Sequence, residues 1–77
     1  METKILEIRE EGNLRFKLVL NTFNNGDYNY SVIEELIKGN NLLNDNSELS
    51  HSVFNTLRKA RNNLNKNCKR GLIIPLN

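Results

Sequence analysis

The most restrictive feature of the sequence is the alternation over Leu14–Leu20, in which every second residue from Leu14 is apolar and the first two residues between them, Arg15 and Lys17, are charged. Apolar residues at every second position would line one face of a strand, while Arg15 and Lys17 point to the other face. A second alternating stretch, Lys4–Arg9, precedes it, and Gly12 in the connection tolerates the left-handed backbone of a tight turn. The pattern therefore predicts an N-terminal β-hairpin.

Two helices are expected after the hairpin. Ser31 and Glu34 have the spacing of a capping box, and Lys38-Gly39 is a helix-ending signature, so the first helix is placed at residues 31–39. The second helix is placed at residues 50–66, because apolar residues recur every three or four positions along one side of it. These residues are Leu49, Val53, Leu57, Ala60 and Leu64.

The remaining segments complete a single domain, 1–77. Residues 40–47 fit either a brief buried strand or one helical turn, and Leu72–Ile74, ended by Pro75, predicts a C-terminal strand. This order indicates an α+β domain, in which the hairpin and the last strand form one antiparallel sheet packed against two main helices.

Composition argues against several classes of function. Cys68 is the single cysteine, so no internal disulfide is possible, and no Cys/His spacing suggests a metal site. The only histidine, His51, has no evident partner for acid–base chemistry, and we expect neither catalysis nor a cofactor. No apolar run resembles a signal peptide or a membrane span. We therefore expect a cytoplasmic protein without a membrane partner or a small-molecule substrate.

Charge is distributed very unevenly along the chain. Residues 1–48 carry five basic and nine acidic side chains, whereas residues 49–77 carry six basic side chains and no acidic one. A solvated helix face is the ordinary explanation for such a run, but solvated faces usually mix charges of both signs. A phosphate backbone would relieve the repulsion and release counterions. The distribution therefore favours nucleic acid as the partner.

The candidate contacts come from the basic segment. Arg58, Lys59, Lys66, Lys69 and Arg70 are expected to meet phosphates, while Asn55, Arg61 and Asn62 are placed nearer the bases. Double-stranded DNA is favoured over single-stranded RNA, because the aromatic residues precede the basic residues of this segment and Phe16 alternates into the core face of its strand.

The run Leu57-Arg58-Lys59, followed by Arg70-Gly71, resembles the winged-helix DNA-binding (effector) domain of bacterial response regulators. The resemblance implies a small winged-helix-like domain acting as a transcriptional regulator. It also implies that the helix at residues 50–66 enters the major groove, with a wing at residues 69–71.

A protein-interaction module is the alternative interpretation. A phage-type inhibitor or adaptor would dock the basic helix on an acidic protein surface and pair its hairpin edge with a partner strand. A homodimer is a further alternative, because a palindromic DNA site needs two copies of the protein. Whether the acidic half of the chain folds over the basic helix is the question that separates a binding surface from a salt-bridged scaffold.

Overall fold

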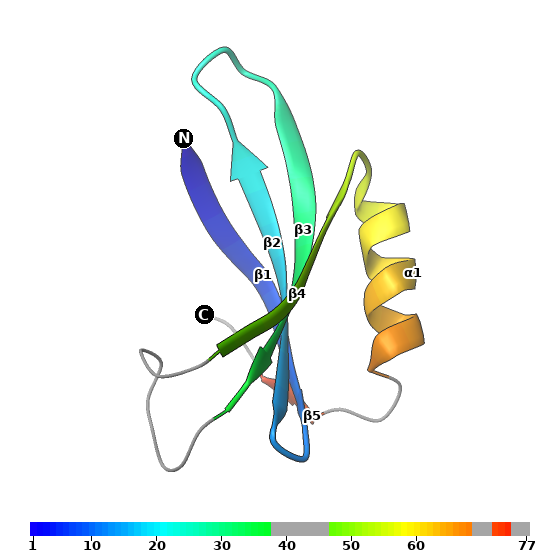
Figure 1. Cartoon of the computed structure of the whole chain (residues 1–77). Helices are drawn as coiled ribbons and strands as arrows, with labels where there is room; N and C mark the ends of the chain where they lie inside the picture. The colour runs from blue at the N-terminus through cyan, green and yellow to red at the C-terminus, as the bar shows by residue number, and fades with distance from the viewer. Residues whose placement is uncertain (38–46, 69–71, 75–77) are drawn as a thin grey trace.

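The computed structural model describes residues 1–37, 47–68 and 72–74. Its strands form one antiparallel sheet in the order β4-β3-β2-β1-β5, and one helix among these residues lies against a face of that sheet (Figure 1). The elements are β1 Glu2–Glu11, β2 Leu14–Thr22, β3 Tyr28–Leu36, β4 Ser47–Phe54, α1 Leu57–Asn67 and β5 Leu72–Ile74.

The predicted N-terminal hairpin is confirmed. β1 pairs antiparallel with β2, from Glu2 opposite Thr22 to Glu11 opposite Leu14. Gly12 closes the turn with φ +62°, a conformation in which a side chain with a Cβ is strained. The predicted C-terminal strand is also found, as β5, which pairs antiparallel with β1.

The predicted helix at residues 31–39 is wrong over its described part, where the chain forms β3. β3 pairs with β2 over its whole length. Neither side chain of the supposed capping box caps a helix. Ser31 Oγ accepts a hydrogen bond from Asn21 Nδ2 at 2.8 Å, and Glu34 Oε1 accepts one from Ser50 Oγ at 3.3 Å.

The predicted long helix at residues 50–66 is wrong in its first part. β4 runs to Phe54, and α1 begins only after Thr56, whose side chain accepts a hydrogen bond from the Lys59 N–H at 3.2 Å. Of the apolar stripe, Leu49 and Val53 are therefore on a strand, where they are 53% and 57% exposed.

The winged-helix fold is wrong as well. That fold needs at least two main helices under its sheet, and the described residues hold α1 alone. The residues assigned to a wing, 69–71, and most of the ambiguous segment 40–47 lie outside the described residues.

The hydrophobic core lies between α1 and the middle of the sheet. Phe16 and Leu18 of β2 and Val32 of β3 meet the buried residues Ala60 and Leu64 of α1. Cys68, directly after the helix, is buried in the same cluster. Partly buried hydrophobic residues pack around the edge of this cluster, namely Leu6, Leu14, Tyr30, Phe54 and Leu57.

The opposite face of the sheet has no helix over it among the described residues, and polar contacts cross it. Val19 and Ser31, which pair across β2 and β3, are buried at its centre. Lys17 Nζ lies 3.0 Å from Glu35 Oε2, one of the ion pairs that neutralise charges within the sheet. Lys17 and Glu35 therefore neutralise each other on this face.

Candidate nucleic-acid interface

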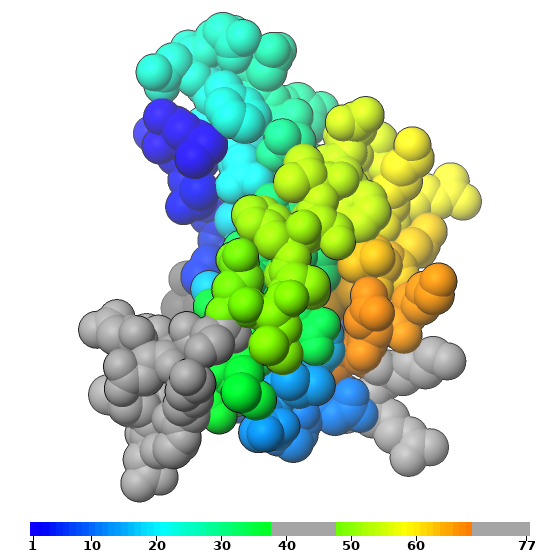
Figure 2. All heavy atoms as spheres, in the orientation of Figure 1, coloured from blue at the N-terminus to red at the C-terminus, as the bar shows by residue number. Residues whose placement is uncertain are grey.

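The outer face of α1 follows from how the helix packs. Leu57, Ala60 and Leu64 recur every three or four residues and face the sheet. The residues half a turn away from them must point to solvent, and Arg58 and Lys66 are exposed there. In Figure 2 the atoms of α1, coloured yellow to orange, stand out from the sheet on this side of the molecule.

Four of the residues proposed from the sequence share this outer face. Arg58, Asn62 and Lys66 are spaced by four residues, which places them in one row along the helix, and all are exposed. Lys59, also exposed, lies beside the row. We call Arg58, Lys59, Asn62 and Lys66 the basic row.

The other proposed residues are placed differently. Arg61 is on the flank of α1, where its Nη2 lies 3.9 Å from Glu7 Oε1 on β1. Asn55 precedes the helix instead of standing on its outer face. Lys69 and Arg70 lie outside the described residues.

The acidic half of the chain does not cover the basic row within the described structure. Four of its described carboxylates form ion pairs with side chains of the sheet: Glu7 with Arg9, Glu10 with Arg15, Glu35 with Lys17, and Glu48 with His51. Among the described residues, the one ion pair between these carboxylates and α1 is Glu7–Arg61, and the Arg61 side chain is 47% exposed. Among the described residues, the side chains of Arg58, Lys59 and Lys66 make no ion pair.

The electrostatics of the helix itself favour an anion on this face. No acidic residue lies in the first turn of α1, and Lys66 lies in its last turn. The three cations of the basic row lie on a helix without a carboxylate and repel each other, and only solvent ions screen that repulsion in the isolated protein. An anion bound along the row would lower this repulsion.

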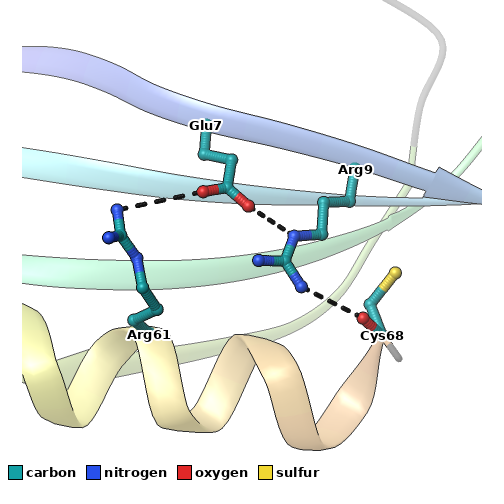
Figure 3. Close-up of polar contacts among 4 residues, drawn as sticks. All are labelled: Glu7, Arg9, Arg61 and Cys68. Carbon is teal, nitrogen blue, oxygen red and sulfur yellow. Dashed lines mark hydrogen bonds and ion pairs between the residues drawn. The ribbon is translucent and has the colours of Figure 1, made fainter. Parts of the chain in front are cut away.

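Sequence reasoning missed Arg9, which ties the end of α1 to the sheet. The Arg9 guanidinium, from β1, forms an ion pair with Glu7 and donates a hydrogen bond from Nη1 to the Cys68 carbonyl oxygen at 3.2 Å (Figure 3). Cations at a helix C-terminus are favoured by the helix dipole. No signal in the sequence relates Arg9 to a residue 59 positions later, because the contact exists only after the sheet and helix have met.

A shallow depression of about 740 Å³ adjoins the start of α1. It lies between the β2–β3 loop and the turn before the helix, and its lining is rich in amide side chains. The lining residues are Phe23, Asn24, Asn25, Gly26, Asp27, Tyr28, Asn29 and Asn55. Asn55 therefore links the depression to the helix that carries the basic row.

Neither a protein-family model, nor a curated protein, nor a solved structure matches this chain. In the part of the chain that the structure describes, no helix has the length and apolarity needed to cross a membrane.

Proposed function

We propose that the protein binds the sugar-phosphate backbone of double-stranded DNA through the outer face of α1. The observation that carries this proposal is that Arg58, Lys59 and Lys66 point outward from one helix without an ion-pair partner among the described residues. The proposal needs neither a second helix nor a wing.

The dimensions of the basic row suit several phosphates at once. Arg58 and Lys66 are eight positions apart, which is about 12 Å along a helix axis. DNA rises about 3.4 Å per base pair, so the row spans the phosphates of about three to four base pairs. Asn62, in the middle of the row, can both donate and accept hydrogen bonds. Binding of this kind is led by counterion release and depends only weakly on sequence.

The test is duplex binding as a function of salt, measured by fluorescence anisotropy on a random-sequence duplex. Each phosphate contact contributes about 0.9 to the slope of log K against log salt concentration. Arg58→Gln/Lys66→Gln should therefore weaken binding and reduce the slope by about 1.8. Lys4→Glu is the matched control, because it changes net charge by the same amount from an exposed position on β1.

Two outcomes would overturn the proposal. The first is an equal loss of slope in the double variant and in Lys4→Glu, which would mean that only net charge matters. The second is the absence of duplex binding at low salt, which would favour an acidic protein surface as the partner of the basic row.

A second candidate ligand is single-stranded nucleic acid, because two exposed aromatic rings line the depression beside α1. Tyr28 is 59% exposed and Phe23 is 38% exposed. Stacking of a base on such a ring contributes about 1–3 kcal/mol. Tyr28→Ala should weaken binding of a single-stranded oligonucleotide and leave duplex binding unchanged. Equal effects on the two ligands, or none, would contradict this candidate.

A further inference from the structure

The two edges of the sheet are unequal. β5, at one edge, is a three-residue strand, and short edge strands offer little to a partner. β4, at the other edge, is eight residues long and pairs only with β3 among the described residues. Figure 2 shows the atoms of β4, in yellow-green, uncovered at the front of the molecule.

The pairing pattern identifies which backbone groups of β4 point outward. The Ile37 N–H donates to the Asn13 carbonyl at 2.8 Å, just beyond the β2–β3 ladder. Because hydrogen bonding alternates along antiparallel strands, odd-numbered residues of β3 bond to β2 and even-numbered ones bond to β4. The backbone of Ser52, which is opposite Val32, therefore bonds inward to β3. The backbone N–H and C=O groups of His51 and Val53 point away from the sheet.

The outward edge lacks the usual protection against strand pairing. β4 contains no lysine, arginine or proline, the residues that commonly block an exposed edge. A register shift opposite Glu34 and Glu35 marks a bulge near Leu49, and bulges bend an edge away. The bulge leaves the stretch Ser50–Phe54 regularly paired with β3, so this stretch is the part of β4 that is open to a partner.

We propose that two copies of this chain pair through Ser50–Phe54 of their β4 strands. The two strands would run antiparallel and be related by a two-fold axis at Ser52. In this register His51 lies opposite the partner's Val53, and Val53 lies opposite the partner's His51. These are the positions whose backbone groups point outward, so each pair can exchange two hydrogen bonds. The two Ser52 side chains meet on the axis.

The sequence of the stretch favours a second copy over an unrelated strand. An isologous interface requires a surface that complements itself. Centred on Ser52, the register opposes no two charges of the same sign, since the stretch Ser50–Phe54 holds no carboxylate, lysine or arginine. It also sets the exposed Val53 beside an imidazole on the face away from α1, where aliphatic contact is gained.

The symmetry has a consequence for the helices. A two-fold axis between antiparallel strands of one continuous sheet runs perpendicular to that sheet, so the same face of each copy points the same way. α1 contacts β2, β3 and β4, and β3 lies one strand from the junction. Strands are about 4.8 Å apart, so the two β3 strands, and the helices above them, would lie about 14 Å apart. The two basic rows would then form one surface.

Cysteine cross-linking tests the axis directly. Residues of a non-hydrogen-bonded antiparallel pair have Cα atoms about 4.5 Å apart, which is within disulfide range. Under mild oxidation, Ser52→Cys should form a covalent dimer at least about tenfold faster than Ser50→Cys, which is displaced from the axis on the same strand. The wild-type protein is the background control, since its single cysteine is buried.

Sedimentation equilibrium tests the association itself. The wild-type chain should be a reversible dimer, and His51→Pro should raise the dissociation constant at least about tenfold, because one outward N–H is removed from each copy. The substitution leaves the β3–β4 hydrogen bonds in place, and circular dichroism checks the fold.

Two outcomes would contradict the proposed dimer. A wild-type chain that stays monomeric at the highest attainable concentration would overturn it. So would a dimer in which Ser52→Cys cross-links no faster than Ser50→Cys, since its interface would lie elsewhere. These readouts do not involve DNA, so they stand or fall independently of the proposed function.

Discussion

Arg9 joins β1 to the end of α1 through one side chain. It lies on β1, forms an ion pair with Glu7, and donates to the carbonyl of Cys68 at the end of α1. Its side chain is only 13% exposed, so water cannot readily replace these partners. The end of α1 is therefore held to the sheet by a charged contact in addition to apolar packing.

Substitution of Arg9 should measure that contact. Arg9→Met keeps much of the aliphatic bulk but leaves Glu7 and the Cys68 carbonyl without their donor, and we expect the free energy of unfolding to fall by about 2 kcal/mol. Arg61→Met removes the same charge from the Glu7–Arg61 pair, in which the two atoms are 3.9 Å apart and the arginine side chain is 47% exposed. Its effect on the free energy of unfolding should therefore be below about 0.5 kcal/mol. Urea unfolding followed by circular dichroism compares the two. Equal losses would show that the Arg9 contacts add nothing specific.

At the scale of elements, α1 depends on a cap that sequence reasoning placed too early. The sequence pattern predicted that this helix begins at residue 50, which lies in β4, whereas the observed cap is Thr56. Thr56→Ala should lower the free energy of unfolding by about 1 kcal/mol, because the Lys59 N–H loses its acceptor. Thr56→Ser retains the hydroxyl and should retain most of this free energy when both variants are measured by urea unfolding. Failure of serine to do so would implicate the lost methyl group instead.

The elements also show what the sequence pattern can and cannot predict. The β1–β2 hairpin was predictable because one face of β2 is apolar and the other carries Arg15 and Lys17. β3 lies between two strands, with Val32 buried under α1 and Ile33 partly buried on the other face. Its apolar residues therefore follow no period of two, and their spacing imitates a helical stripe.

The candidate site was predictable only where it depends on local structure. Arg58, Asn62 and Lys66 are exposed as expected, because the predicted helix is present at these residues. The spacing of its apolar residues determines which face packs on the sheet and therefore which face is exposed. The Glu7–Arg61 contact was not predictable, since it joins β1 to α1 across the folded domain. Nor was the edge position of β4, because strand order in a sheet is set by tertiary packing.

At the scale of the whole molecule, one small core supports both proposed surfaces. The basic row is the outer side of the helix whose inner side carries Ala60 and Leu64, and the β4 edge belongs to the sheet on which that helix packs. Loss of α1 from the sheet would therefore remove the proposed DNA surface and expose the core at once. Folding and function are coupled through the same few buried side chains.

Leu64→Ala tests this dependence on the core. Leu64 is fully buried, and removal of such a side chain typically costs about 2–5 kcal/mol. A chain of this length has a total stability of about 4–12 kcal/mol, so the variant should lose a large share of it. Leu49→Ala, at an exposed position on β4, should change stability by less than about 0.5 kcal/mol.

The alkylation rate of the Cys68 thiol measures how often α1 leaves the sheet. The thiol is buried beside Leu64, so alkylation requires α1 to leave the sheet, and the labelling rate reports the population of that open state. With opening fast relative to labelling, Leu64→Ala should accelerate alkylation at least about thirtyfold, the factor that corresponds to 2 kcal/mol, whereas Leu49→Ala should not. Labelling that is equally slow in wild type and Leu64→Ala would mean that α1 does not depend on this core to stay on the sheet. The basic row would then be carried by contacts elsewhere, of which the Arg9–Cys68 hydrogen bond is the first to test.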